Sequence, residues 1–392
     1  MHILEAYALS SGRKIKKPFI VEKFFPLNLD KYIVIQPFSK PSKSYDYWND
    51  VIEEIYPILQ QNGYSILQIG AKNEPALKGC YNLAGQTNLG QAAYLIRNCE
   101  LFLGADSFGA HIASSFGKKI VALYSNNYVE CVKPFWSTNE NSILLEPETG
   151  KKPSFSFEEN PKSINKIPSE KIAESVVKLL GIDYESKYET IFTGSLYQNK
   201  YIETIPNQVV NTKEIGIESI VVRMDMVYSI DHLVNQLNLC KCSIVTDREI
   251  DINLIKAFKD RIKELIFDVK NEKGFSGEYL SRIQELNIPN FLLTSLKGDD
   301  LNRVKLEFLD FGNINEKNDL SSVLKELISK YPDKKLFYKS NKITLSEGMI
   351  FQSIFGLKNN LPVANMKSEI QEVSLNEDFI AEMENFKILI EK

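Results

Sequence analysis

The sequence has few of the residues from which metal centres and disulfide frameworks are built. Its 392 residues contain three histidines, His2, His111 and His232, which disfavours a histidine-based metal centre. The number of cysteines is odd and their spacing is irregular, a pattern typical of a reducing cytosol rather than a disulfide scaffold. They are Cys80, Cys99, Cys131, Cys240 and Cys242. The pair Cys240 and Cys242 has no companion pair, so zinc binding is not expected.

Long apolar segments and a strong charge of one sign are absent as well. No run of eighteen apolar residues occurs, and residues 1–30 lack the core of a signal peptide, so we expect a soluble, cytoplasmic protein. The net charge of -4 gives no overall attraction to nucleic acid or anionic membranes. Residues 1–43, however, hold eight Lys or Arg against three acids. This basic opening is either a solvated surface or a patch that faces phosphates.

The length predicts two or three domains, and the pattern of apolar residues predicts parallel α/β sheets. In the first half the predicted strands cover residues 31–36, 64–69, 81–85, 101–103 and 120–124. The predicted helices there cover residues 2–11, 47–61, 89–98, 109–116 and 169–180, with a linker at 146–168. Residues 182–218 are poorly patterned.

Strands and helices alternate again from Ser219. The predicted strands cover 219–224, 243–246, 265–269, 291–294, 306–309 and 336–339, and the helices 230–237, 252–264, 277–286 and 320–331. Several strands end in a polar residue, namely Asp225, Asp247, Asp268, Ser295 and Asp310. In a parallel sheet these residues share one edge, where they either form a site or cap helices.

The segment from Asn98 to Ser125 organises the first half. An apolar strand is followed by Gly104 to Ser107, by a helix, and by a second strand that ends at Tyr124. Asp106 or Ser107 can cap this helix, and the positive end of the helix dipole then faces the crevice where parallel sheets bind ligands. The segment therefore predicts an anion site, most naturally for phosphate, although Asp-Ser before a helix is also an ordinary N-cap.

Five features of residues 31–181, in order and spacing, resemble the donor-binding half of the heptosyltransferases (glycosyltransferase family nine, GT-B fold). The first is IVIQPFSKPSKSYDYW, with Ser39, Lys43 and Tyr45. The next are SILQIGAKNE, with Gly70 and Glu74, and LAGQTNLGQAAYLI over residues 83–96. The signature Asp-Ser/Thr-Gly-x-x-His-x-Ala corresponds to residues 106–113, and a helix like 169–180 closes the family's domain. The first thirty residues loosely resemble those of phage-encoded chains of this type.

The resemblance implies a GT-B-like α/β fold of two Rossmann-like parallel-sheet domains, with the donor-type domain first. The implied division is an N-terminal extension at 1–30, a nucleotide-sugar-binding domain at 31–183, and a second α/β domain at 184–392 that could bind the acceptor. The donor site would contain Ser39, Lys43, Gly70, Glu74, Thr87, Asp106, Ser107, Phe108, Gly109 and His111. Lys43 and the amides of 107–109 would neutralise the diphosphate, Glu74 would accept bonds from ribose, and Thr87 and Leu89 would lie near the base.

The chain departs from the family pattern in two ways. Phe108 stands where the signature has glycine, with Gly109 one place later. In the family the donor half comes second, whereas only about thirty residues precede it here. The acceptor hydroxyl needs a general base, for which Asp225 and Asp247 are candidates and Glu5 a further one.

The function that these features favour is a metal-independent, inverting glycosyltransferase. It would use a nucleoside-diphosphate sugar as substrate and need no cofactor. The acceptor would be a glycan such as lipopolysaccharide or a hydroxylated DNA base, which would have to be flipped out. A sugar-nucleotide 2-epimerase of GT-B fold and a non-catalytic sugar-nucleotide-binding module are the alternatives. The donor sugar and the oligomeric state are left open.

Overall fold

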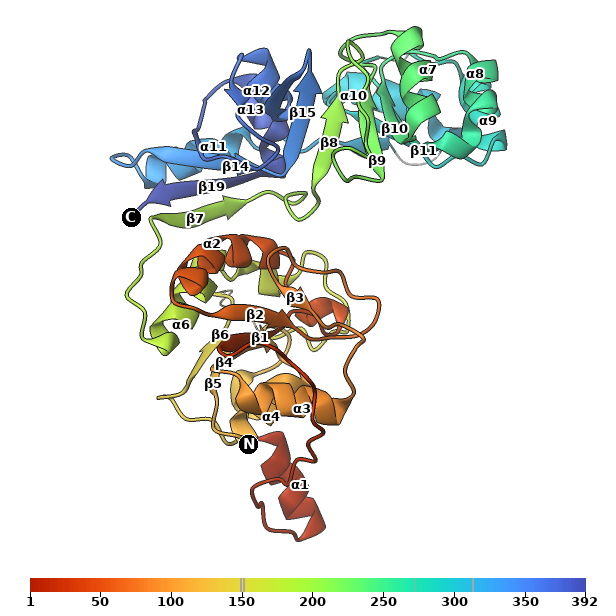
Figure 1. Ribbon diagram of the computed structural model, residues 1–392. Coiled ribbons are helices and arrows are strands. Elements are labelled where there is room, and N and C mark those ends of the chain that lie inside the picture. The colour runs from red at the N-terminus through yellow and green to blue at the C-terminus, as the bar shows by residue number, and fades with distance from the viewer. Residues whose placement is uncertain (149, 151, 272, 312–313) are drawn as a thin grey trace. The chain divides into compact units, whose positions relative to one another are not determined.

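The computed structural model describes residues 1–148, 150, 152–271, 273–311 and 314–392 (Figure 1). The chain forms two compact units, one of Met1–Thr190 with Lys392 and one of Ile191–Glu391. Among the described residues no helix is both long enough and apolar enough to cross a membrane.

The first unit is built on a six-stranded parallel sheet with strand order β3-β2-β1-β4-β5-β6. The strands are β1 (Tyr32–Gln36), β2 (Ser65–Gln68), β3 (Tyr81–Asn82), β4 (Leu101–Ala105), β5 (Lys119–Leu123) and β6 (Ser142–Leu145). Every residue of β1 and β4 is buried, which explains their continuous apolar runs. The strand order reverses direction between β1 and β4, the point where doubly wound sheets bind ligands.

Helices cover both faces of this sheet (Figure 1). They are α2 (Trp48–Gln61), α3 (Leu89–Asn98), α4 (Phe108–Ser115), α5 (Val129–Val132) and α6 (Ser169–Leu180), with short 3-10 turns η1 (Pro41–Lys43) and η2 (Ser163–Lys166). Helix α2 packs with α6, and α3 packs with α4. Alternate strand residues such as Val34 and Phe102 join α3 and α4 in one core, as the two-residue period of a strand requires.

The second unit contains a nine-stranded sheet with order β13-β12-β11-β10-β9-β8-β15-β16-β17. Its strands are β8 (Tyr201–Thr204), β9 (Ser219–Arg223), β10 (Lys241–Thr246), β11 (Ile262–Asp268), β12 (Asn290–Thr294), β13 (Ile314–Glu316), β15 (Lys342–Ser346), β16 (Met349–Gln352) and β17 (Pro362–Val363). The seven strands from β13 to β15 are parallel, and β16 and β17 are antiparallel. Strands β8 to β13 follow one another in chain order, unlike the strands of the first unit.

Helices of the second unit are α7 (Ile230–Leu239), α8 (Ile252–Ala257), α9 (Gly277–Glu285), α10 (Gly298–Glu307), α11 (Ser321–Lys330), α12 (Ser353–Lys358) and α13 (Glu377–Glu382), with turns η3 (Lys259–Arg261), η4 (Leu309–Phe311) and η5 (Met383–Asn385). A separate four-stranded sheet has the order β18-β14-β19-β7. It consists of β18 (Gln371–Glu372), β14 (Leu336–Ser340), β19 (Phe386–Glu391) and β7 (Tyr188–Thr193). Tyr338, Phe379 and Phe386 form the centre of its core.

Two predicted elements are wrong, and one range without a prediction contains strands. Residues 306–309, predicted as a strand, lie at the end of α10 and in η4, because the apolar side chains Leu301 and Val304 are buried at helical spacing. The helix predicted over 252–264 ends at Ala257, since β11 already begins at Ile262. The poorly patterned range 182–218 contains β7 and β8, whose apolar residues do not alternate cleanly.

Candidate functional site

A cleft of about 810 Å³ opens at the carboxyl ends of β1, β2 and β4 in the first unit. The predicted donor-site residues that line it are Ser39, Lys43, Gly70, Glu74, Thr87, Asp106, Ser107, Phe108 and His111. Leu89, expected near the base, lines it too. These residues come from four separate segments, which the strand order brings to one edge of the sheet. Gly109 is buried beside the cleft.

The N-terminus of helix α4 is capped by the side chain of Gln36, the last residue of strand β1. The backbone N–H of Gly109 donates to Gln36 Oε1 at 3.2 Å, and the Ser107 hydroxyl donates to the same oxygen at 2.7 Å. Ser107 occupies the N-cap position, but its side chain makes no capping bond. The prediction that the Asp106 or Ser107 side chain caps the helix is therefore wrong. Gln36 lies at the end of β1, the neighbour of β4, and its amide reaches the helix first.

Gly109 is required for this close approach. A β-carbon at this position would lie 2.5 Å from Gln36 Oε1 and 2.5 Å from the Phe102 ring. Both neighbours are buried, so neither can move aside cheaply. This contact explains why residue 109 is a glycine. Position 108 faces the cleft instead, and its Phe108 side chain is partly exposed.

Replacing Gly109 with alanine should destabilise the first unit by about 1–3 kcal/mol, the usual cost of overpacking a core. Urea unfolding followed by circular dichroism would measure this change. Gly277→Ala is the matched control, because a β-carbon there meets nothing closer than the Phe311 ring at 3.6 Å. Equal stability changes in the two variants would contradict the packing role of Gly109.

Lys43 and Asp106 form an ion pair inside the cleft. Their side chains are only 16% and 9% exposed. Lys43 is held in place by its loop: Ser42 Oγ donates to Ser156 O at 2.8 Å, and the fully buried Tyr45 donates to Ile167 O at 2.7 Å. The ammonium group thus has a fixed position above the carboxyl ends of β1 and β4. An anion entering the cleft would find a cation whose carboxylate partner it can displace or share.

Glu74 and Gly70 fit together on the other side of the cleft. A β-carbon at Gly70 would lie 1.7 Å from Glu74 Oε2, so any other residue at position 70 would displace this carboxylate from its present position. Burial raises the pKa of Glu74, and a backbone hydrogen bond at Ala71 opposes the shift. In the described part of the chain, Oε2 is buried without a hydrogen-bond partner. Such an oxygen is an acceptor that a ligand hydroxyl would satisfy.

His111 is kept neutral by its surroundings. Burial lowers its pKa, the positive charges of His2 and Lys43 lower it further, and Asp106 opposes them. A neutral imidazole can donate one hydrogen bond and accept another, but it adds no fixed positive charge to the cleft. Beside Asp106 the positive charge therefore comes from the Lys43 side chain rather than from the histidine.

The sequence analysis missed several cleft residues. Gln36, Phe38, Lys40 and Asn88 also line the cleft. The signal for Gln36 was available, because it is a polar residue at the end of a fully buried strand and is itself only 5% exposed. Its function as a cap for α4 depends on the pairing of β1 with β4, which the sequence does not reveal.

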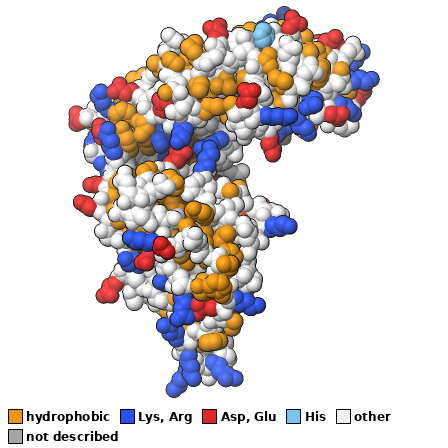
Figure 2. Space-filling view, viewed as in Figure 1, with side chains coloured by type: hydrophobic (Ala, Val, Ile, Leu, Met, Phe, Trp, Pro, Cys, Tyr) orange, Lys and Arg blue, Asp and Glu red, His pale blue; other side chains and the backbone are white. Residues whose placement is uncertain are grey.

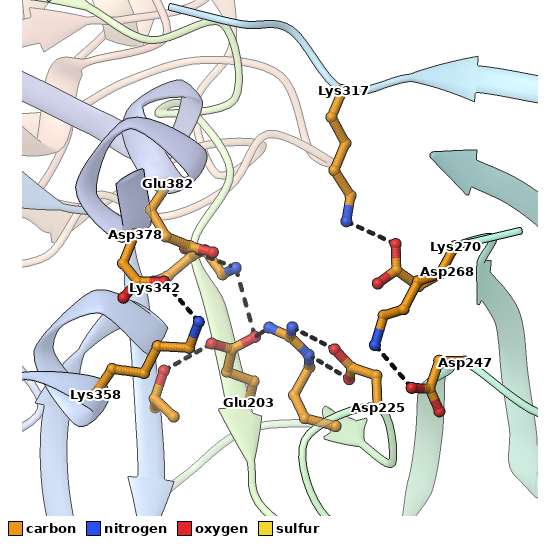
Figure 3. Close-up of polar contacts among 12 residues, drawn as sticks. Glu203, Asp225, Asp247, Asp268, Lys270, Lys317, Lys342, Lys358, Asp378 and Glu382 are labelled. Carbon is orange, nitrogen blue, oxygen red and sulfur yellow. Dashed lines mark hydrogen bonds and ion pairs between the residues drawn. The ribbon is translucent and has the colours of Figure 1, made fainter. Parts of the chain in front are cut away.

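The candidate general bases Asp225 and Asp247 lie in the second unit and are held by cations (Figure 3). Asp225 accepts from Arg223 Nε at 2.8 Å and Nη2 at 2.7 Å. Asp247 accepts from Arg248 Nε at 2.9 Å and Lys270 Nζ at 2.7 Å. Burial raises the pKa of Asp247, but these two hydrogen bonds outweigh it and lower the pKa below its ordinary value. The lowered pKa makes Asp247 a weak proton acceptor, and the two hydrogen bonds from Arg223 occupy the oxygens of Asp225.

The row of strand-end carboxylates forms only in part. Asp225, Asp247 and Asp268 follow or end β9, β10 and β11, and Asp268 accepts from Lys317 Nζ at 2.7 Å (Figure 3). Asp310 lies in η4, away from any strand end, because 306–309 is not a strand. Glu5, the third candidate base, accepts from His2 N at 2.9 Å and completes the capping box of α1 (Ile3–Ser11).

Deeper in the second unit lies a buried network of five charged residues, Glu203, Arg223, Asp225, Lys342 and Glu382 (Figure 3). Glu203 Oε2 lies 2.9 Å from Arg223 Nη1 and 3.5 Å from Lys342 Nζ, and its Oε1 accepts from Thr344 Oγ1 at 2.6 Å. Lys342 also pairs with Glu382 at 3.0 Å. Burial opposes the charge on Glu203, but Lys342 and Arg223 outweigh it and hold its pKa at about 2. Since these buried charges are paired, removing one of them would leave another charge buried without its partner.

The sulfur and metal chemistry of the described residues is limited. All five cysteines are free thiols, and Cys240 Sγ lies 3.9 Å from Cys242 Sγ. Burial raises the pKa of the Cys242 thiol, so it is not a reactive thiolate. Within the described part of the chain, no group of three or more His, Cys, Asp or Glu side chains is arranged to hold a metal ion.

Residues 9–164 match the sequence model of a family described as glycosyltransferase family 9 (heptosyltransferase). This range contains the whole cleft, so the resemblance predicted from the motifs is confirmed for this part of the chain. Beyond residue 164 the family model does not extend.

Two curated relatives are similar to part of the chain. Lipooligosaccharide heptosyltransferase 2 of Haemophilus influenzae is 32% identical over 121 residues, 28% of this chain and 34% of that protein. The protein of the same name from Haemophilus ducreyi is 31% identical over 99 residues, 21% of this chain and 28% of that protein. The chain thus spans about a third of the length of these relatives.

Two solved structures are similar over part of the chain. The ADP-heptose lps heptosyltransferase II of Escherichia coli is 22% identical with a TM-score of 0.31, covering 39% of this chain and 47% of that one. A glycosyltransferase family 9 protein from Veillonella parvula is 21% identical with a TM-score of 0.32, covering 45% and 50%.

Proposed function

We propose that the first unit binds a nucleoside-diphosphate sugar and that the chain transfers the sugar to an acceptor hydroxyl. The observation that carries this proposal is the Lys43–Asp106 ion pair at the strand-order reversal, inside a segment that matches glycosyltransferase family nine. A cleft of about 810 Å³ is large enough for a nucleotide sugar.

In this mechanism the diphosphate lies between Lys43 and the N-terminus of α4. Negative charge grows on the diphosphate as the bond to the anomeric carbon breaks. A fixed ammonium group and a helix dipole stabilise that charge in the transition state without a metal ion. The unpartnered Glu74 Oε2 accepts a hydrogen bond from a ribose hydroxyl, and neutral His111 donates to the sugar or the phosphate.

The acceptor hydroxyl attacks the anomeric carbon on the face opposite the diphosphate, so the transfer is inverting. The bond from the anomeric carbon to the diphosphate oxygen breaks as the glycosidic bond forms, the diphosphate leaves with the electron pair, and the hydroxyl proton passes to water. We assign acceptor binding to the second unit, where Asp247, Asp268 and their lysine partners form a polar edge of the sheet. Carboxylate and ammonium groups hydrogen-bond the hydroxyls of a sugar well. The names of the relatives favour a lipooligosaccharide as the acceptor and ADP-heptose as the donor.

A nucleoside diphosphate of the correct base should raise the melting temperature of the first unit. At a hundred times its Kd a ligand adds about 2.7 kcal/mol, which is a shift of about 5–10 °C for a unit of this size. The test is a thermal-shift series with ADP, GDP, UDP and CDP and with ADP-heptose. EDTA should not change the shift, because the proposed site neutralises the diphosphate with Lys43.

Glu74→Ala should reduce this ligand-induced shift, because it removes the acceptor for the ribose. Glu100→Ala is the control, since Glu100 is exposed and lies before β4, at the opposite end of the strand from the cleft. The ligand-induced shift is compared rather than the melting temperature itself, because loss of a buried carboxylate also changes the free protein. No shift with any of these ligands would refute donor binding.

The identified donor is then incubated with a lipooligosaccharide and with DNA that contains hydroxymethylated bases. Transfer to the glycan alone is the expected result. Donor binding with cleavage or epimerisation of the nucleotide sugar, but without transfer, would instead support the epimerase. Donor binding without any reaction would support a non-catalytic binding module.

A further inference from the structure

Residues 3–24, here called the N-terminal arm, expose an unusual amount of apolar surface. The described residues include 25 large hydrophobic side chains classed as exposed, and seven of them lie in this short segment. They are Ile3 46%, Tyr7 64%, Leu9 70%, Ile15 37%, Phe19 90%, Val21 63% and Phe24 71%. An apolar surface of this density marks an interaction site.

The arm is also basic, in contrast to the acidic chain as a whole. It contains Arg13, Lys14, Lys16, Lys17 and Lys23 against the acids Glu5 and Glu22. Figure 2 shows Lys and Arg side chains interleaved with hydrophobic ones at the end of the first unit that carries α1. Glu22 is paired with Arg97, so its charge is already neutralised.

Contacts with the first unit fix the arm at both ends. At the start, His2 Nε2 lies 2.9 Å from Lys133 O, and the His2 ring packs on Phe135 at 4.9 Å. At the end, Lys23 N donates to Gly90 O at 3.0 Å, and Phe24 packs edge-on against Tyr94 at 5.4 Å. Between these anchors the arm projects its side chains into solvent.

Helix α1 is well formed although it has no core of its own. A capping box of His2 and Glu5 begins it, and Gly12 ends it with φ +64°. None of its residues is buried. The helix has capped ends but gains little stability from packing on the first unit. Its exposed Leu and Tyr side chains are therefore available to be buried against a binding partner.

We propose that the arm binds the surface of an anionic lipid bilayer. The aromatic and aliphatic side chains would enter the boundary between headgroups and acyl chains, while the Lys and Arg side chains contact lipid phosphates. A nucleic acid would match the positive charge but would leave Leu9, Ile15 and Val21 without an apolar partner. A second copy of the arm would match the apolar surface but would bring like charges together.

This surface lies on the donor-binding unit, close to the cleft. Lys23 N donates to Gly90 O at 3.0 Å, and the adjacent residue Leu89 lines the cleft. Binding through the arm would therefore hold the donor site near the bilayer, where a lipid-linked glycan acceptor is found. This last point rests on the proposed function, whereas binding to the bilayer does not.

Flotation of the full chain with vesicles tests the proposal. The chain should float with vesicles of phosphatidylcholine and phosphatidylglycerol (70:30) at low salt, and hardly with phosphatidylcholine alone. The double variant Leu9→Ser/Phe19→Ser should reduce the bound fraction at least tenfold, and so should the replacement of Arg13, Lys14, Lys16 and Lys17 by Gln. Leu306→Ser/Leu309→Ser is the matched control, since these side chains are 74% and 73% exposed in the second unit.

Unchanged flotation of both arm variants, or no flotation of the parent chain, would overturn the proposal. Two other results would also overturn it. One is a dimer in light scattering that Leu9→Ser/Phe19→Ser converts to a monomer, and the other is DNA binding that is lost in the Gln variant. Because Leu9, Phe19 and the four basic residues are all exposed, both variants should keep the parent melting temperature. The nucleotide-induced thermal shift is measured on the same variants, so that loss of vesicle binding is distinguished from failure of the donor site.

Discussion

Replacing Lys43 with alanine should lower kcat/KM for sugar transfer by about 10²–10³-fold, the usual effect of removing one preorganised group that stabilises a developing anion. Lys43 is the cation that the structure holds at the carboxyl ends of β1 and β4, and its side chain is only 16% exposed. Its low exposure and anchored loop mean that water does not replace it easily. Initial rates with the donor identified by thermal shift would measure the change.

Lys178→Ala is the control for this experiment, because Lys178 is an exposed residue in the last turn of α6. It should leave kcat/KM unchanged. Lys43→Ala also leaves Asp106 without its partner, so the melting temperature of the variant must be measured in parallel. A loss of rate smaller than threefold in a folded variant would mean that Lys43 does not face the diphosphate.

Replacing Arg223 with leucine should destabilise the second unit by about 3–5 kcal/mol, the cost of leaving buried charges without their partner. Arg223 bridges Glu203 and Asp225, whose side chains are 3% and 6% exposed. Arg248→Leu is the control, since Arg248 also pairs with an aspartate but is 57% exposed, and its loss should change the stability much less. Urea unfolding of both variants at pH 7 measures the difference.

The pH dependence of this difference identifies the charge responsible. The pKa of Glu203 is about 2 in the folded chain and about 4.3 when unfolded, so its contribution is complete above the unfolded value and is lost as the pH falls through the folded one. In Arg223→Leu a proton can replace the missing cation. The gap in stability between parent and variant should therefore narrow from pH 7 to pH 3, and a gap independent of pH would contradict the electrostatic role.

Much of the first unit could be predicted from the sequence. Strands such as Leu101–Ala105 are continuous apolar runs, and helix 169–180 is predicted with the bounds that the structure has, because both are buried on regular faces. The motifs around Lys43, Glu74 and Asp106 were sufficient to select nine of the residues that line the cleft. These motifs are short-range patterns. Each follows a strand, and a parallel sheet places the residues after its strands at the same carboxyl edge.

The second unit was less predictable. Its strands β7 and β8 lack clean alternation, and the β8 residues Glu203 and Thr204 are buried polar residues in the middle of a sheet. Their burial is possible because partners such as Arg223 and Lys342 come from other strands. A single sequence does not show which cation pairs with which carboxylate. The sequence therefore predicts Asp225 as a candidate base, whereas in the structure Asp225 accepts two hydrogen bonds from Arg223.

The sequence by itself determined the α/β class, the family resemblance and the residue types of the donor cleft, because periodicity and local motifs act over a few residues. Only the tertiary structure decided how those residues are used. Gln36 caps α4 across the sheet, Gly109 admits it, and Asp106 pairs with Lys43 rather than capping the helix. Each of these contacts joins segments far apart in the chain, and their geometry depends on which strands pair and how closely the helices pack against them.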